Sequence, residues 1–237
     1  MLFLTRWDDD TAAPPVRYAL KDLAVRAVLP AVGLFVLMTG LGLIVMGPLG
    51  GLKGENDLNR SLEAGRTPTW NGITHVLSSA GNTEYVIGLA VLVAIAVFWR
   101  TRRWWFSVVP LVAISLQSLV FVSSAAIVGR DRPEVERMDP TPPTASFPSG
   151  HTSAATALWT SMALLAMRIE NKALRTVVVA LCLTVPVLVA AARVYRGAHH
   201  VTDVLAGLLN GGVCAVLAWR WLHRDQDTSE RALPTRD

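Results

Sequence analysis

Charged residues are scarce in this sequence. Asp, Glu, Lys and Arg together make up 17% of its 237 residues, whereas soluble domains carry roughly a quarter. Cysteine is also rare, and the two present, Cys182 and Cys214, show neither the CxxC pattern nor metal-ligand spacing. No basic patch with interleaved aromatic residues is found, which argues against nucleic-acid binding. The 52% hydrophobic content and the mean hydropathy of +0.41 favour a membrane protein.

The scarcity of charge is concentrated in six uncharged stretches. A helix needs roughly 20 apolar residues to cross a bilayer core of about 30 Å, where only a helix satisfies its own backbone groups. Two stretches reach that length alone, and the other four reach it when flanking small or aromatic residues are added. Six in one chain argue against a soluble helical bundle. We therefore predict an all-α fold, a six-span transmembrane helical bundle. The stretches are 27–47, 85–99, 104–129, 152–167, 176–192 and 204–219.

The positions of Lys and Arg predict how the spans are oriented. Basic residues gather before the first span, at 100–103, at 168–175 and after the last span, and with six spans all four groups fall on one side. Cytoplasmic segments carry the excess of Lys and Arg, so this side is predicted to be cytoplasmic, with both termini on it. We divide the chain into a cytoplasmic arm (1–26), a membrane domain (27–222) and a disordered tail (223–237). We expect no cleaved signal peptide, because the first apolar run begins 26 residues into the chain.

The long connection at 48–84 is predicted to lie outside the membrane. Apolar residues recur there at helical spacing, which indicates short amphipathic helices on the membrane surface. A surface loop with some apolar contacts is the alternative. Cys182 and Cys214 lie at similar depth in the last two spans, and we expect two small core residues rather than a disulfide.

Three further outward segments carry the residues that suggest chemistry: GRDRP (129–133), SFPSGHT (146–152) and RVYRGAHHVTD (193–203). Arginine binds phosphate through a planar, permanently charged fork. Ser149 and Gly150 stand at an expected helix N-terminus, where backbone N–H groups favour an anion. The segments therefore predict an anion site made of arginines and a backbone cradle.

The spacing of two adjacent histidines adds a nucleophile to this site. His199 and Asp203 are four residues apart, so on a helix they share a face, and His200 at three residues is also within reach of the carboxylate. An aspartate on the imidazole N–H fixes the tautomer and makes the other nitrogen a better nucleophile. His151 starts a separate helix and is placed to protonate a leaving oxygen. This combination predicts phosphoryl transfer through a phosphohistidine.

These segments resemble the three-part signature of the membrane-bound type 2 phosphatidic acid phosphatases, K-x6-R-P, P-S-G-H and S-R-x5-H-x3-D. The second part is complete at 148–151, and the third is matched by Arg193, His199 and Asp203, which selects His199 over His200. The resemblance covers about residues 27–222. It implies that His199 is the nucleophile, Asp203 its orienting carboxylate and His151 the general acid. It also implies that the phosphate is held by Arg132, Ser149, Gly150 and Arg193.

Two positions depart from that signature. Ala125 stands where the first part has its lysine, and Ala192 replaces the serine before Arg193. Arg130 and Arg196 are the nearest cations that could replace the lysine. We expect Arg130 to do so and to bind the phosphate, because it shares a loop with Arg132.

The sequence thus predicts an integral-membrane hydrolase of a lipid phosphate or diphosphate, acting at the outer membrane surface. The expected substrate is an amphiphile such as phosphatidic acid, phosphatidylglycerol phosphate or an isoprenyl phosphate carrier. No metal-ligand pattern appears, so we expect catalysis without a metal or another cofactor. The alternative is a lipid-phosphate transporter or flippase that uses the arginines for binding alone, although the histidine–aspartate pair then has no purpose.

Overall fold

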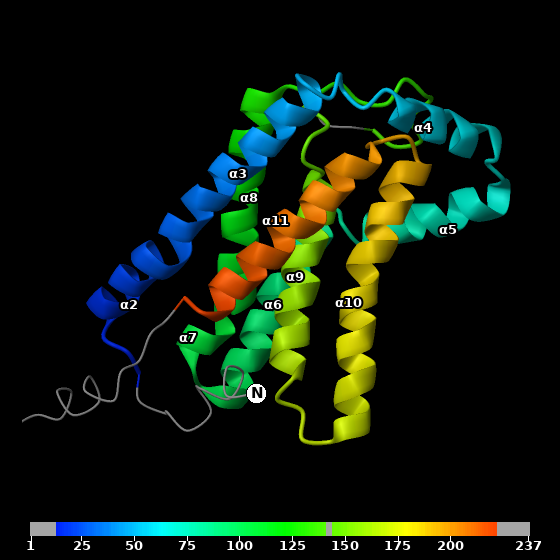
Figure 1. Ribbon diagram of the computed structural model, residues 1–237. Helices are drawn as coiled ribbons and strands as arrows, with labels where there is room; N and C mark the ends of the chain where they lie inside the picture. Colours follow the sequence, from blue (N-terminus) through cyan, green and yellow to red (C-terminus); the bar gives the residue numbers. More distant parts are fainter. Residues whose placement is uncertain (1–12, 141–143, 222–237) are drawn as a thin grey trace, which may run out of the picture.

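The computed structural model describes residues 13–140 and 144–221, and the predicted tail (223–237) lies outside them. Every regular element within these residues is helical, so the all-α prediction is confirmed. The elements, labelled as in Figure 1, are α2 (Val16–Leu23), the π-helical turn η1 (Ala24–Val28), α3 (Leu29–Met46), α4 (Gly54–Ala64), α5 (Pro68–Ser79), α6 (Thr83–Thr101), α7 (Trp104–Ser107), α8 (Val109–Val128), α9 (Gly150–Ala166), α10 (Lys172–Tyr195) and α11 (Val201–Trp219).

Five helices within the described residues are long and apolar enough to cross a membrane. They are Val16–Met46, Thr83–Thr101, Val109–Val128, Lys172–Tyr195 and Val201–Trp219. The predicted fourth span corresponds to α9, which has 17 residues and is shorter than these five. The first span begins at Val16 because α2, η1 and α3 run on as one helix of 31 residues. Residues 16–26, predicted to belong to the arm, are therefore helical.

Helix α9 lies at the centre of the bundle and packs against α6, α8, α10 and α11. Its buried side chains are mostly Ala, Ser and Thr, which keep the helix thin. On α11, Gly207 and Gly211 face it: a Cβ at Gly207 would lie 2.8 Å from the Ser149 carbonyl oxygen, and one at Gly211 would collide with the Ser153 carbonyl oxygen. Small residues let two membrane helices approach closely. The packing of α9 on α11 therefore depends on the absence of side chains at two positions.

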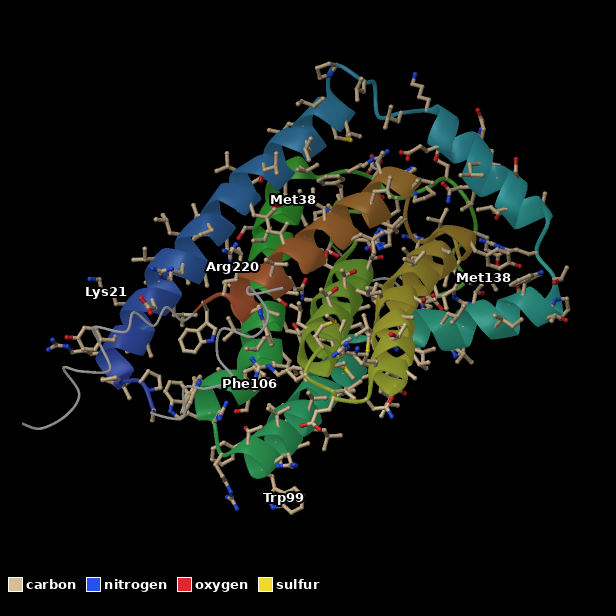
Figure 2. All side chains as sticks on the ribbon, turned by 60° about the horizontal axis from the view of Figure 1, so that its bottom comes forward. Lys21, Met38, Trp99, Phe106, Met138 and Arg220 are labelled. Carbon is tan, nitrogen blue, oxygen red and sulfur yellow. The ribbon has the colours of Figure 1, made fainter. Side chains whose placement is uncertain are left out.

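Apolar side chains fill the end of the bundle that lies away from the predicted site segments. Phe106 and Trp219 meet edge to face, with ring centroids 5.4 Å apart, and the Arg168 guanidinium lies 4.2 Å from the centroid of Phe106. Met38 of α3 is fully buried in the same core, whereas Trp99 projects away from the bundle (Figure 2). Both cysteines are free and buried, as expected of core residues.

The connection between the first two spans forms the helices α4 and α5, as predicted. Both helices pack against α10, so some of their apolar residues contact the bundle. Leu62 of α4 packs on the cluster of Ala190, Val194 and Val204, while Val76 of α5 is largely exposed. This connection thus lies against the end of the bundle where α10 and α11 meet.

Replacement of Gly211 by alanine should destabilise the protein, because the new methyl group meets the backbone of α9. Overpacking of a fitted core typically removes about 1–3 kcal/mol of stability. Gly212 is a matched control, since its nearest neighbour would be 4.0 Å from a Cβ. Thermal unfolding in detergent should show a lower Tm for Gly211→Ala and an unchanged or higher Tm for Gly212→Ala. Equal Tm values would contradict the close approach of α9 and α11.

Candidate active site

The three motif segments meet at one end of the bundle (Figure 1). They lie where α8 ends, where α9 begins and where α10 turns into α11. Gly129 ends α8 with a left-handed conformation (φ +62°), which a glycine adopts without a steric penalty. The GRDRP segment then leaves the direction of the helix. The helix ends therefore bring together residues that are up to 74 positions apart in the sequence, from Gly129 to Asp203.

The ring of His199 is held by Ser146. His199 Nδ1 lies 2.9 Å from the Ser146 carbonyl oxygen. A carbonyl oxygen only accepts hydrogen bonds, so Nδ1 must carry the proton and the lone pair must be on Nε2. Ser146 stands in the segment SFPSGHT, but the sequence motifs gave it no role. The structure thus selects the tautomer that a nucleophilic Nε2 requires.

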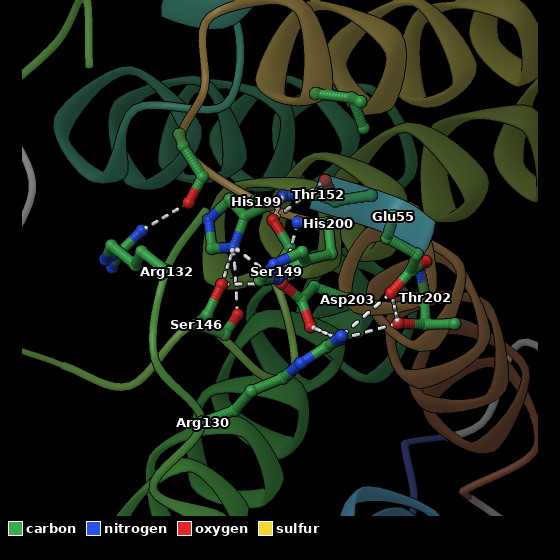
Figure 3. A network of polar contacts seen from close by, with 12 residues as sticks. Glu55, Arg130, Arg132, Ser146, Ser149, Thr152, His199, His200, Thr202 and Asp203 are labelled. Carbon is green, nitrogen blue, oxygen red and sulfur yellow. Dashed lines mark hydrogen bonds and ion pairs between the residues drawn. The ribbon is translucent and has the colours of Figure 1, made fainter. Parts of the chain in front are cut away.

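Asp203 is hydrogen-bonded to Ser146 and lies close to His199 without bonding to its ring. Its Oδ2 is 3.8 Å from His199 Nδ1, and it instead accepts hydrogen bonds from Ser146 Oγ at 2.5 Å and from the His200 backbone N–H at 2.9 Å (Figure 3). In this geometry the Asp203 carboxylate reaches His199 through Ser146 and not by the direct hydrogen bond that the spacing predicted. His200 also contacts the same carboxylate, with Nδ1 at 3.2 Å from Oδ2, and its Nε2 lies 3.2 Å from the Asn56 side-chain oxygen.

Arg130 has partners other than a phosphate. Its Nη1 donates to Asp203 Oδ1 at 2.6 Å and its Nη2 to Glu55 Oε2 at 2.8 Å. The side chain is 2% exposed and does not line the cavity that contains His199. These contacts do not support the predicted role of Arg130 as a phosphate ligand in place of the missing lysine, and Arg130 lines a different, neighbouring cavity together with Arg132. Each terminal nitrogen of the guanidinium already donates to a carboxylate, Nη1 to Asp203 and Nη2 to Glu55.

Arg193 and Arg196 share one carboxylate, Asp139. Arg193 Nη1 donates to Asp139 Oδ2 and to Ser78 Oγ, both at 2.9 Å, and Arg196 binds both carboxylate oxygens. Burial of Asp139 opposes its ionisation, but the hydrogen bonds and charge of Arg196 outweigh this and lower the pKa of the carboxyl. Arg193 also keeps a buried Nε without a partner among the described residues, and its side chain lines the His199 cavity. That N–H remains available for a ligand.

Arg132 is held by two backbone carbonyl groups. Its Nη1 donates to Ala198 at 2.8 Å and its Nη2 to Thr144 at 3.2 Å, and the side chain lines the same cavity. Burial and the nearby charge of Arg137 lower the pKa of Arg132, so a bound anion would stabilise its charged form. The structure thus places Arg132 and Arg193, both predicted from the sequence, at the cavity.

The start of α9 contributes unequally to this cavity. Ser149 is fully buried, its hydroxyl caps the helix at Thr152, and its backbone N–H donates to the Asp203 carbonyl oxygen at 2.9 Å. Gly150 lines the cavity, where a Cβ would lie 2.8 Å from the ring of Phe121. His151 also lines it, and its Nε2 lies 3.1 Å from the Asn82 side-chain oxygen. Gly150 and His151 therefore face the cavity, whereas the groups of Ser149 are already bonded.

The cavity that joins these residues has a volume of about 260 Å³ and two chemically different sides. Arg132, His151, Arg193 and His199 form the polar side. The other side is mainly apolar and is formed by α6 and α8, which contribute Val86, Ile87, Ile114, Phe121 and Val122 together with the polar residues Thr83, Gln117 and Ser118. A neighbouring cavity of about 380 Å³ shares His151 and Arg193, and its remaining wall is mainly polar: Ser78, Ser79, Asn82, Glu84 and Asp139.

Comparison with known protein families bears directly on this arrangement. Residues 106–227, just over half of the chain, match the model of the PAP2 superfamily. The chain belongs to the PAP2 superfamily. The resemblance to its membrane phosphatases that the sequence motifs indicated is thereby confirmed. Comparison with curated protein sequences gave no match.

Two solved structures share the fold of this PAP2 protein. The transmembrane PAP2-type phosphatidylglycerolphosphate phosphatase from Bacillus subtilis has a TM-score of 0.70 and 21% identity, over 87% of this chain and 98% of that one. LpxE from Aquifex aeolicus has a TM-score of 0.54 and 23% identity, over 68% of this chain and 92% of that one. The fold of the superfamily thus extends into the N-terminal half, and the protein is a multi-pass membrane protein.

His199 should titrate far below an ordinary histidine. Burial lowers the pKa of His199 to about 4, so the neutral ring should persist as the pH falls and protonate only near that value. Spectra of the protein with ¹⁵N-labelled histidine should show an unprotonated Nε2 and a protonated Nδ1 at pH 6, with the change near pH 4. His199→Asn assigns the resonance. A midpoint at or above 6.5, or a proton on Nε2, would contradict the geometry.

Proposed function

We propose that this protein is an integral-membrane lipid phosphatase that hydrolyses a lipid phosphate or diphosphate through a phosphohistidine intermediate. The observation that carries the proposal is one cavity in which two histidines and two arginines face an apolar wall. Its polar side suits a phosphate group, and its apolar side suits the hydrocarbon part of the same molecule. Membership of the PAP2 superfamily supports the reaction class.

In the proposed reaction His199 is the nucleophile and His151 transfers the protons. Nε2 of His199 attacks phosphorus and a P–N bond forms. The P–O bond to the leaving group breaks as His151 gives that oxygen a proton, and the leaving group is a lipid alcohol from a monophosphate or a lipid monophosphate from a diphosphate. Water then attacks phosphorus, the P–N bond breaks, and His151 takes the proton of the water. Arg132, Arg193 and the backbone of Gly150 hold the phosphoryl oxygens, and Ser149 supports them by capping α9.

The two neighbouring cavities, which share His151 and Arg193 in their linings, suggest separate routes for the lipid and for phosphate. The apolar wall belongs to α6 and α8, whose outer surfaces carry exposed apolar residues such as Ile87 and Val122. A lipid chain is expected to leave the site between these helices. The polar cavity beside His151 and Arg193 offers inorganic phosphate and water a route that does not cross hydrocarbon.

We propose six spans, with α9 as the fourth. Its 17 residues extend about 26 Å, slightly less than the hydrocarbon core. Other helices surround α9, so its ends meet protein instead of lipid and need not match the bilayer thickness. The site end then lies outside, with the basic end and both termini in the cytoplasm.

The orientation is testable with single cysteines at Arg137→Cys and Lys172→Cys, which lie at opposite ends of the bundle. In intact cells, a membrane-impermeant thiol reagent should label the first and reach the second only after permeabilisation. The parent protein is the control, since Cys182 and Cys214 are buried. Labelling of both positions from the same side would refute the six-span orientation.

The phosphatase and transporter functions are separated by phosphate release. The purified protein should release inorganic phosphate from at least one of phosphatidic acid, phosphatidylglycerol phosphate and isoprenyl diphosphate. His199→Asn should reduce the rate at least about a thousandfold, because the nucleophile is lost. His200→Asn should keep most activity, since His200 does not line the cavity. Release from none of these lipids, with lipid movement across vesicles instead, would favour the transporter.

A further inference from the structure

The proposed chemistry gives no role to the ion pair between Glu55 and Arg130. Through Arg130 this pair is connected to Asp203, the carboxylate close to His199. The Arg130 fork joins two carboxylates from distant segments, Asp203 through Nη1 and Glu55 through Nη2 (Figure 3). The same nitrogens also donate to Thr202 Oγ1 at 2.6 Å and to the Gly51 carbonyl oxygen at 2.9 Å. Both terminal nitrogens of Arg130 therefore have two partners each at a buried position.

Glu55 also holds the start of α11. Its Oε1 accepts from the Thr202 backbone N–H at 2.8 Å, and its Oε2 accepts from Thr202 Oγ1 at 2.9 Å. Thr202 lies in the first turn of α11, where backbone N–H groups lack partners within the helix and the helix dipole favours a carboxylate. A residue of α4 thus fixes the turn that follows His199 and His200 and carries Asp203.

Asp203 needs this support because its side chain is fully buried. Loss of one partner of a buried ion pair leaves an uncompensated charge, which a protein tolerates poorly. Without Arg130, the Asp203 carboxylate would be expected to turn toward other donors and weaken its hydrogen bond with Ser146 Oγ. Ser146 is also the residue whose carbonyl oxygen fixes the tautomer of His199.

We propose that Glu55 and Arg130 are positioning residues, which act through Asp203 and Ser146 on the orientation and tautomer of His199. The proposal rests on the proposed role of His199 as nucleophile. It makes the outward helix α4 a part of the active site. It also removes Arg130 as a replacement for the lysine that Ala125 displaces. Ala125 borders a neighbouring open cavity that Arg130 and Arg132 also line.

The test compares Arg130→Gln, Arg130→Lys and Glu55→Gln with a control from the same helix, Arg60→Gln. Arg60 joins α4 to the same loop through Glu134 at 3.1 Å, but both side chains are exposed and neither contacts Asp203. For each purified protein, kcat and KM are measured on a lipid phosphate, together with the inhibition constant of inorganic phosphate. The ¹⁵N resonances of His199 report its tautomer without turnover.

Arg130→Gln should lower kcat about a hundredfold, as expected when a reacting group is misplaced by about 1 Å. KM and the inhibition constant of phosphate should change by less than about threefold, because Arg130 does not line the cavity that is proposed to hold the phosphate. Arg130→Lys should recover part of kcat, and Glu55→Gln should lower kcat while shifting the His199 resonances in the same direction as Arg130→Gln. Arg60→Gln should leave all of these values unchanged.

Ala125→Lys separates positioning from phosphate binding. If Arg130 positions Asp203, a lysine at 125 does not restore kcat to Arg130→Gln. Restored kcat in the double variant would show that Arg130 binds the phosphate and would overturn the proposal. An inhibition constant of phosphate that rises about tenfold or more in Arg130→Gln would overturn it in the same way.

The positioning proposal and the proposed function fail separately. Wild-type kcat in both Arg130→Gln and Glu55→Gln would overturn positioning and leave lipid phosphate hydrolysis standing. A wild-type protein that releases no phosphate would end the proposed function, while unchanged His199 resonances in the variants would still decide against positioning. Should Arg130→Gln fail to fold, Arg130→Lys and Glu55→Gln give the same readouts.

Discussion

The buried carboxylate of Asp203 is the constraint on which the rest of the site depends. A fully buried anion must be paired and hydrogen-bonded, and this one collects its partners from the GRDRP loop, from Ser146 and from the backbone of His200. Its backbone carbonyl oxygen also binds the N–H of Ser149, at the start of α9. One residue therefore fixes the relative positions of all three motif segments, and the cavity is the space that remains between them.

The arginines around this carboxylate divide into two kinds. Arg130 and Arg196 are held by carboxylates and lie outside the lining of the His199 cavity, whereas Arg132 and Arg193 line it. Arg193 also binds Asp139, but Arg132 is held only by carbonyl oxygens in the contacts described above, so its positive charge is less compensated. Rigid, partly desolvated cations of this kind stabilise charge that develops on phosphoryl oxygens, because they need little reorganisation during the reaction.

The sequence predicted the helical membrane fold and the arginines and histidines that line the cavity, but neither its apolar wall nor the contacts between these residues. Uncharged blocks reveal spans, since hydrocarbon excludes charge. The i, i+4 spacing assumed that His199 and Asp203 share a helix, but α11 begins only at Val201, and the Asp203 carboxylate lies 3.8 Å from His199 Nδ1. Spacing along one helix could not reveal Ser146, because its contacts with both residues are made across the bundle. The partner of Arg130 was equally hidden: Glu55 lies 75 positions away, in a connection whose sequence resembles an ordinary amphipathic helix. The start of the first span was missed because α2 carries charges and still continues into α3.

The same charge pattern gives a physical account of the missing lysine. Three arginines (Arg130, Arg193 and Arg196) are bonded to three carboxylates (Glu55, Asp139 and Asp203), whereas the contacts of Arg132 given above are with carbonyl oxygens. Of these four arginines, Arg132 therefore carries the charge that has no bonded carboxylate in the part of the chain that the structure describes. A lysine at 125 would add a second cation beside the loop of Arg132, whose pKa burial and Arg137 already lower. A weaker attraction for phosphate is tolerable when the substrate is held in the bilayer by its hydrocarbon part, because the membrane keeps its local concentration high.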